Sequence, residues 1–251
     1  MITSFGLTDK GRYRAENQDS YEITLTDGAT LTVVCDGMGG AAAGKLASEM
    51  AVKRFTAFAR AGFAIGGTGQ DEDVLRQAAD AANREIFHFA ETSAEYAGMG
   101  TTLVGAVFRE DAVTFVNVGD SRAYRIARDG IVQITKDHSL VQQMVDAGAL
   151  TREEARRHPR RNIITRAVGS EAFVTSDLFT LPLREGDIFL LCTDGLTGAV
   201  PDAELHRLAL ASPDAESACR ALVDTALQNN TRDNVTAVVV IIREKGESDR
   251  G

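Results

Sequence analysis

Short runs of apolar and β-branched residues recur along the chain and predict buried strands. These runs are Val33 to Cys35, Thr101 to Phe108, Val113 to Val118, Ile188 to Cys192 and Val235 to Ile242. Their length and their richness in valine, isoleucine and phenylalanine are typical of strands inside a sheet. Residues 124–127 and 131–134 flank Arg128-Asp129-Gly130, and this Asp-Gly pair predicts a hairpin between two more strands.

Apolar residues at helical spacing predict helices between these strands. The predicted helices cover residues 43–60, 72–90, 140–147 and 215–228. The first two are rich in alanine and carry an apolar stripe, as expected of helices that pack against a sheet. Gly66-Gly67-Thr68-Gly69 predicts a flexible loop between them. Residues 244–251 are polar, and we expect them to form a frayed tail.

The strands and helices follow one another in blocks and do not alternate regularly. Several strands are joined by turns of hairpin length, which favours antiparallel pairing. The sequence therefore predicts an α+β fold in which helices cover the outer faces of antiparallel sheets. A length of 251 residues suffices for one large domain or two small ones, and we expect a single domain over residues 1–243.

Composition excludes several classes of function. The formal net charge of −9 argues against nonspecific binding to nucleic acid or to an anionic membrane. Long apolar stretches are absent, so we expect no transmembrane helix, and the first residues lack the features of a signal peptide. Cys35, Cys192 and Cys219 show no paired spacing, so we expect reduced core residues of a cytoplasmic protein.

Aspartates follow directly after three of the predicted strands, each at a turn that contains glycine. The segments are Val34-Cys35-Asp36-Gly37, Val118-Gly119-Asp120 and Cys192-Thr193-Asp194-Gly195. In addition, Asp233 precedes the last strand and Asp19 follows Asn17-Gln18. Any one of these aspartates has an ordinary explanation as a turn residue or a helix cap. Their repetition at strand ends favours a shared role.

Strand ends along one edge of a sheet would gather several carboxylates in a small volume. Unneutralised carboxylates there would repel one another and raise their own pKa values, and a divalent cation relieves this repulsion. Ligation by aspartate oxygens, without cysteine or histidine nearby in the sequence, favours Mg²⁺ or Mn²⁺ over Zn²⁺. Two such ions can share a bridging water, lower its pKa and orient it for attack on phosphorus.

At these residues the sequence resembles the type 2C metal-dependent protein phosphatases in their compact bacterial form. The resemblance follows the family's order from about Thr8 to Ile242. The matching segments are Thr8-Asp9-Lys10-Gly11, Arg14-Ala15-Glu16-Asn17-Gln18-Asp19, Val34-Cys35-Asp36-Gly37-Met38-Gly39-Gly40, Gly98-Met99-Gly100-Thr101-Thr102, Val118-Gly119-Asp120-Ser121-Arg122, Asp137-His138-Ser139, Ile164-Thr165-Arg166-Ala167-Val168-Gly169, Thr193-Asp194-Gly195-Leu196 and Asp233-Asn234-Val235-Thr236. Each segment alone is weak evidence, whereas the ordered set is specific.

The resemblance implies a β-sandwich of two antiparallel sheets flanked by antiparallel helix pairs, in four layers α/β/β/α, with a flap at about residues 139–174. It implies hydrolysis of phosphoserine and phosphothreonine in proteins by attack of a metal-bridged water. The expected partners are phosphorylated proteins, namely the substrates of a serine/threonine kinase and the kinase itself, and the expected state is a monomer. Two alternatives stay open: an inactive regulatory protein of the same fold, and a phosphatase that acts on small molecules.

The resemblance also assigns the site residues. It implies two Mn²⁺ or Mg²⁺ ions and a third, weaker site, with ligands from Asp19, Asp36, Gly37, Asp120, Asp194 and Asp233. Asp36 would bridge two ions, and Asp194 and Asp233 would complete the shell of one of them. The carbonyl of Gly37 would bind the other ion, helped through water by Asp19. Asp120 would form the third site together with Asp194.

The resemblance gives Arg14 the task of gripping the substrate phosphate, beside Asp36 as the central catalytic residue. A guanidinium suits this role because it is always charged and offers a planar fork of donors. The proton donor stays unassigned, since Met38 stands where some family members carry a histidine. For His138 a structural role near the flap is favoured over catalysis.

The flap is basic, with Arg152, Arg156, Arg157, Arg160 and Arg161. Two interpretations of this charge stay open: the arginines dock phosphorylated or acidic segments, or they form a solvated helix face.

Overall fold

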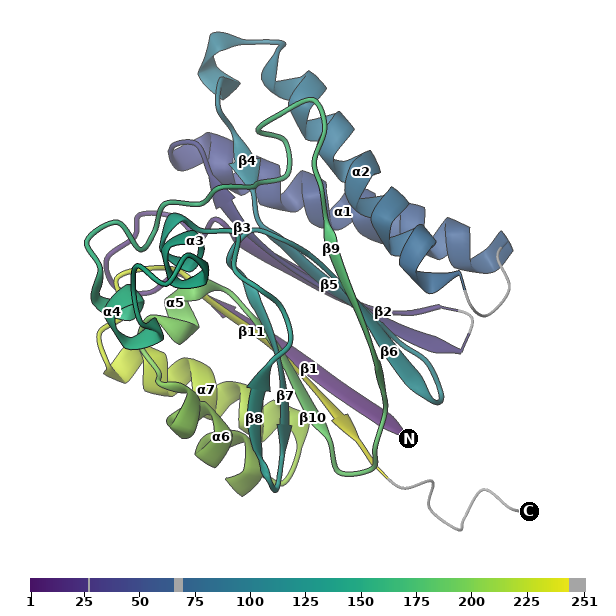
Figure 1. Ribbon diagram of the computed structural model, residues 1–251. Coiled ribbons are helices and arrows are strands. Elements are labelled where there is room, and N and C mark those ends of the chain that lie inside the picture. The colour runs from purple at the N-terminus through teal and green to yellow at the C-terminus, as the bar shows by residue number, and fades with distance from the viewer. Residues whose placement is uncertain (27, 66–69, 244–251) are drawn as a thin grey trace.

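Two antiparallel sheets pack face to face between two layers of helices in the computed structural model (Figure 1). The structure describes residues 1–26, 28–65 and 70–243, so the predicted loop Gly66–Gly69 and the predicted tail 244–251 lie outside the described residues. The elements are β1 (Ile2–Asp9), β2 (Asp19–Thr26), β3 (Ala29–Met38), α1 (Ala41–Ile65), α2 (Asp71–Ala90), η1 (Ala94–Tyr96), β4 (Gly100–Thr101), β5 (Leu103–Phe108), β6 (Ala112–Val118), β7 (Arg122–Ala127), β8 (Gly130–Gln133), α3 (Leu140–Asp146), α4 (Arg152–Arg157), β9 (Asp177–Pro182), β10 (Ile188–Cys192), α5 (Asp194–Thr197), α6 (Asp202–Ala211), α7 (Ala215–Gln228) and β11 (Val235–Ile242).

The strand order places the ends of the chain in one sheet. This five-stranded sheet has the order β1-β11-β10-β7-β8. The second sheet has the order β2-β3-β5-β6-β9, and the short strand β4 pairs with β3. The hairpins β2–β3, β5–β6 and β7–β8 supply local antiparallel pairs, and the Asp-Gly hairpin of β7 and β8 is confirmed. Together the two sheets and their helices confirm the predicted α+β sandwich.

The apolar side chains form three cores, one at each interface between layers. Between the sheets, the ring of Phe189 lies 5.4 Å from that of Phe108 and 5.9 Å from that of Phe115. Outside the second sheet, α1 and α2 bury residues such as Phe55 and Ile86. Outside the first sheet, α6 and α7 cover β10 and β11 with a third apolar cluster. Within the described residues, no helix is both long enough and apolar enough to cross a membrane.

The predicted helices were found, but three of the four edge strands were not predicted. Helix α7 has the predicted bounds, and α1 extends beyond the predicted 43–60 at both ends. Strands β1, β2 and β9 are missing from the prediction because each lies at the edge of a sheet, where most residues are only half-buried. Such strands need no continuous apolar run, so periodicity gives little signal for them.

Residues 139–174, called the flap segment below, leave the sandwich between β8 and β9. Helices α3 and α4 lie in it, and Ser139 forms an isolated bridge with Ile164 at its base. Near its tip, Arg156 Nη2 lies 2.5 Å from Asp202 Oδ1 of α6. The flap segment therefore contacts α6 on the five-stranded side through Arg156, and Val168 forms an isolated bridge with Thr101 of β4 on the six-stranded side.

Candidate metal centre

Five aspartates from both sheets gather at one end of the sandwich. Asp19 and Asp36 are register partners on β2 and β3 of the six-stranded sheet, and Asp120 follows β6. Asp194 opens α5 directly after β10, and Asp233 lies two residues before β11 of the other sheet. The charges of the other four all act on Asp36, which places Asp36 centrally among them.

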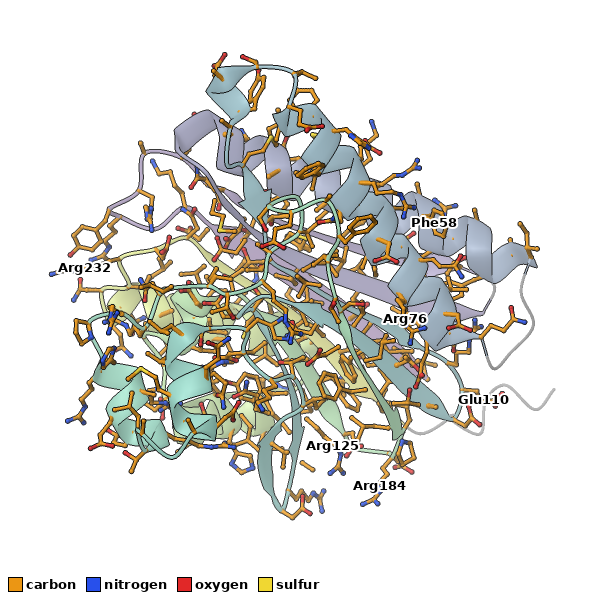
Figure 2. The ribbon with its side chains drawn as sticks, turned by 45° about the horizontal axis from the view of Figure 1, so that its top comes forward. Phe58, Arg76, Glu110, Arg125, Arg184 and Arg232 are labelled. Atoms are coloured by element: carbon orange, nitrogen blue, oxygen red, sulfur yellow. The ribbon has the colours of Figure 1, made fainter. Side chains whose placement is uncertain are left out.

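The site lies at the same end of the molecule as the flap segment. Figure 2 shows Arg232, the neighbour of Asp233, on the opposite side of the molecule from Glu110, which lies in the β5–β6 turn. Helices α3 and α4 lie at the left of Figure 1, and Arg232 is labelled at the left of Figure 2, which is turned about the horizontal axis. The flap segment is therefore placed to border the aspartates.

Burial and mutual repulsion make these carboxylates costly to ionise. Burial raises the pKa of Asp19 to about 7, with the charges of Asp194 and Asp233 adding to the rise. Burial and the charge of Asp233 raise the pKa of Asp194 to about 6. For Asp36 and Asp120, burial and neighbouring carboxylates raise the pKa well above its ordinary value. Charges in such a site need compensation by cations.

Arginines supply only part of this compensation. Arg14 Nη2 donates to Asp233 Oδ2 at 2.6 Å, and this bond raises the pKa of Arg14. Arg122 lowers the pKa of both Asp120 and Asp194, but its guanidinium already binds Asp137, with Nη2 2.6 Å from Oδ2. The remaining negative charge favours one or more bound cations.

Two glycines let the aspartate turns pack tightly against neighbouring backbone. A Cβ at Gly37 would overlap the carbonyl oxygen of Gly44, and a Cβ at Gly195 would overlap the carbonyl oxygen of Asn234. The glycine after Asp194 therefore brings this aspartate beside the segment that carries Asp233. The Asp-Gly pairs thus have a steric reason that the sequence pattern alone did not reveal.

One carboxylate oxygen of the site is buried without a hydrogen bond. Asp19 Oδ2 accepts from the hydroxyls of Thr193 at 2.9 Å and Thr236 at 2.7 Å. Asp19 Oδ1 has no hydrogen-bond partner among the described residues. An unpaired buried carboxylate oxygen fits a site that takes a hydrated cation, because oxygen ligands and retained waters are what Mg²⁺ and Mn²⁺ prefer.

The side chains alone do not form a closed cage. In the described part of the chain, no group of three or more histidine, cysteine, aspartate or glutamate residues is arranged to hold an ion by itself. Asp233 also uses both oxygens, accepting from Arg14 and from the N–H of Asn234. An ion here would need backbone carbonyl oxygen and water besides the carboxylates, as expected for Gly37 and for hard cations.

Thr102 joins two of the aspartate turns, a role that the sequence did not reveal. Its Oγ1 accepts from the N–H of Asp36 at 2.9 Å, and its own N–H donates to the carbonyl of Asp36 at 2.9 Å. The hydroxyls of Thr102 and Ser121 lie 2.7 Å apart, next to Asp120. Thr102 lies within a segment of the family resemblance, and this was the only signal for it.

Asn234 fixes the loop that carries Arg14. Its Nδ2 donates to the carbonyls of Lys10 at 2.8 Å and Glu16 at 2.9 Å, and its Oδ1 accepts from the N–H of Gln18 at 2.9 Å. The loop before β2 is therefore attached to the start of β11. This attachment explains how Arg14 reaches Asp233 across 219 positions of sequence.

A cavity of about 800 Å³ lies under the flap segment, and Asp120 and Asp194 form part of its wall. Arg156 in its lining is paired with Asp202, whereas the charge of Arg161 acts on Asp194. Arg157 is paired with Glu153. Arg156 and Arg157 are thus ion-paired, as expected of a solvated helix face. Arg161 acts on Asp194 through its charge, as expected of an arginine that docks phosphorylated or acidic segments.

Comparison with known proteins shows the family to which the chain belongs. The family model for protein phosphatase 2C matches residues 12–234, and the chain belongs to this family. The serine/threonine phosphatase stp of Listeria innocua is 37% identical over 234 residues, which cover 93% of each chain. The serine/threonine protein phosphatase PstP of Mycobacterium tuberculosis is 38% identical over 92% of this chain and 43% of its own length.

The solved structures that resemble this chain are also serine/threonine phosphatases. The crystal structure of the serine/threonine phosphatase Stp1 from Staphylococcus aureus has a TM-score of 0.90 and 40% identity, covering 97% of this chain and 96% of that one. The catalytic domain of PstP, solved in complex with two manganese ions, has a TM-score of 0.86 and 32% identity, covering 97% and 99%. The fold is therefore that of this family, and one relative binds Mn²⁺.

Proposed function

We propose that this chain hydrolyses phosphoserine and phosphothreonine in proteins with the help of two divalent cations, Mn²⁺ or Mg²⁺, held by the gathered aspartates. It is a metal-dependent serine/threonine protein phosphatase. The observation that carries the proposal is the convergence of five carboxylates from both sheets, with too few arginines to neutralise them. An inactive relative of this fold would have no need to keep so costly a cluster.

Each ligand has a distinct task in the proposed centre. Asp36, central among the carboxylates, would bridge the two ions, and Asp194 and Asp233 would complete the shell of one. The carbonyl of Gly37 would serve the other ion, with Asp19 acting through water. Asp120 with Asp194 would form a third, weaker site. When bound, the ions supply a water of lowered pKa and neutralise charge on the phosphate.

Arg14 would bind the phosphate oxygens of the substrate. Its side chain is 47% exposed and reaches Asp233, so the guanidinium lies at the mouth of the site. A planar fork of donors there can orient the phosphate towards the aspartates. The flap segment would border the polypeptide part of the substrate, with Arg161 facing the site.

The proposed partners are phosphorylated proteins, including substrates of a serine/threonine kinase and the kinase itself. We propose that the chain acts as a monomer in the cytoplasm. Its three cysteines are buried and free, which suits a reducing compartment.

The test is hydrolysis of p-nitrophenyl phosphate and of a phosphothreonine peptide by purified protein in Mn²⁺, with and without EDTA. Asp36→Ala and Asp194→Ala should each abolish the Mn²⁺-dependent activity, whereas Asp224→Ala, at an exposed position of α7, should leave it unchanged. Absence of activity from well-folded protein in excess Mn²⁺ would refute the proposal. A panel of phosphorylated metabolites, compared with phosphoproteins, distinguishes a small-molecule phosphatase.

A further inference from the structure

His138 lies at the base of the flap segment, beside the turn that carries Asp120. The residue is 6% exposed. Its N–H donates to the carbonyl of Gly119 at 2.9 Å, and its own carbonyl accepts from the N–H of Thr165 at 2.7 Å. The main chain of His138 therefore connects the Gly119-Asp120 turn with the residues by which the flap segment returns to the sandwich.

The imidazole ring makes a second connection with its two nitrogens. Nδ1 accepts from the N–H of Gly119 at 3.1 Å, so Nδ1 carries a lone pair and the proton of the neutral ring lies on Nε2. Nε2 lies 3.2 Å from Oδ2 of Asp177, the first residue of β9, and 3.1 Å from Nη1 of Arg166. Arg166 of the flap segment binds Oδ1 of the same carboxylate at 3.0 Å. The ring thus spans from the Asp120 turn to a carboxylate that also holds the flap segment.

The opposite side of this turn is fixed as well. Gly119 has a φ of 106°, and a Cβ there would lie 2.6 Å from Cγ2 of Thr102. Thr102 in turn holds the backbone of Asp36 by two hydrogen bonds. The turn is therefore held between Thr102 and His138. Removal of Nδ1 would take away the imidazole acceptor for the N–H of Gly119.

We propose that His138 is a positioning residue, which holds the Gly119-Asp120 turn through Nδ1 and couples it to the flap segment through Nε2 and Asp177. The proposal rests on the proposed function, because it takes Asp120 as a ligand of the third, weaker ion. Groups that orient a metal ligand commonly change metal affinity about 10- to 100-fold when they are lost. His138 should therefore affect metal binding by one nitrogen and flap placement by the other.

Two isosteric variants separate the nitrogens. In His138→Asn the side-chain oxygen lies near the position of Nδ1 and can still accept from the N–H of Gly119. In His138→Gln the side-chain amide reaches the position of Nε2 and keeps the contact with Asp177, but the acceptor for Gly119 is lost. Asp177→Ala removes the carboxylate that both Nε2 and Arg166 contact and leaves Nδ1 in place. His206→Gln is the matched control, because Nε2 of His206 on α6 lies 2.9 Å from the carbonyl oxygen of Ala127 at the end of β7, away from the aspartates.

Mn²⁺ binding by calorimetry and the steady-state constants for a phosphothreonine peptide and for p-nitrophenyl phosphate supply the readouts. His138→Gln should weaken the weakest Mn²⁺ site about tenfold, and excess Mn²⁺ should restore its kcat. His138→Asn and Asp177→Ala should keep Mn²⁺ affinity within about twofold and raise KM for the peptide severalfold, with KM for the small substrate unchanged. His206→Gln should resemble the wild type in all of these measurements.

Equal Mn²⁺ affinity in His138→Gln and the wild type would overturn the proposal, as would equal loss of affinity in the Asn and Gln variants. If His138→Gln does not fold, His138→Asn and Asp177→Ala decide the question. Weakened Mn²⁺ binding in these two variants, or an unchanged KM for the peptide, overturns the coupling. If the wild type binds no Mn²⁺, the proposed function fails together with this inference. If the wild type binds Mn²⁺ and hydrolyses the peptide while the variants behave alike, only this inference fails.

Discussion

Asp19→Asn should make the protein more stable at alkaline pH when divalent cations are removed by EDTA. The aspartate is buried, and burial raises its pKa from 3.8 to about 7. A carboxyl group whose pKa is raised in the folded state binds more protons when folded than when unfolded. Its contribution therefore lowers stability as the pH rises from about 4, and the full loss is reached above about 7. Raising the pKa by this amount lowers the free energy of unfolding at high pH by roughly 4 kcal/mol.

Asparagine removes this penalty but introduces a smaller one. Its oxygen can accept from the hydroxyls of Thr193 and Thr236, as Oδ2 of Asp19 does. Its amide then occupies the place of Oδ1, which has no partner among the described residues, and a buried unpaired donor costs about 1–3 kcal/mol. At pH 8 the variant should gain about 1–3 kcal/mol over the wild type. At pH 5, where Asp19 is mostly protonated when folded, the gain should disappear or reverse.

Urea unfolding in EDTA at pH 5, 6, 7 and 8 measures this difference. The control is Asp224→Asn at an exposed position of α7, for which the difference from the wild type should stay constant with pH. In saturating Mn²⁺ the advantage of Asp19→Asn should shrink, because bound cations stabilise the wild type by mass action. A pH-independent difference between Asp19→Asn and the wild type would refute the reasoning.

Three other substitutions test the rest of the centre. Arg14→Ala should raise KM for a phosphothreonine peptide about tenfold or more, with partial recovery in Arg14→Lys, since lysine keeps the charge but loses the fork of donors. Gly195→Ala should weaken Mn²⁺ binding and lower the free energy of unfolding by about 1–3 kcal/mol, because its Cβ would overlap the carbonyl of Asn234; urea unfolding and calorimetry measure both effects. Phe189→Ala, between the sheets, should cost about 3–5 kcal/mol in unfolding free energy while leaving the Mn²⁺ requirement of the folded enzyme unchanged.

Much of the interior of the fold could be predicted from the sequence. The buried strands β10 and β11 are continuous apolar runs, and α7 has an apolar stripe, so periodicity located all three. The edge strands β1 and β9 gave no such signal because they bury only part of their residues. The order of the strands in each sheet could not be predicted from the sequence either, since β1 and β11 pair although they are far apart along the chain.

Asp36 and Asp194 could be singled out locally because each lies in an Asp-Gly pair at the end of an apolar run. The groups that hold them could not, because threonine is common in strands and a hydroxyl gives no sign of its partner. Thr102, Thr193 and Thr236 each contact an aspartate or its backbone from a position distant in sequence. The pairing of Arg14 with Asp233 is equally non-local, and only the folded chain reveals that Arg14 also neutralises part of the cluster.

The aspartate cluster spans the interface between the two sheets, and this has a consequence for folding. Asp19, Asp36 and Asp120 belong to the six-stranded side, whereas Asp194 and Asp233 belong to the five-stranded side. The repulsion among them opposes closure of the sandwich, and the aromatic core between the sheets favours it. Cations that bind all of these carboxylates can do so only when the sheets are packed, so binding adds directly to the stability of the closed sandwich. In the proposed centre, bound cations would therefore link the metal content of the site to the stability of the folded state.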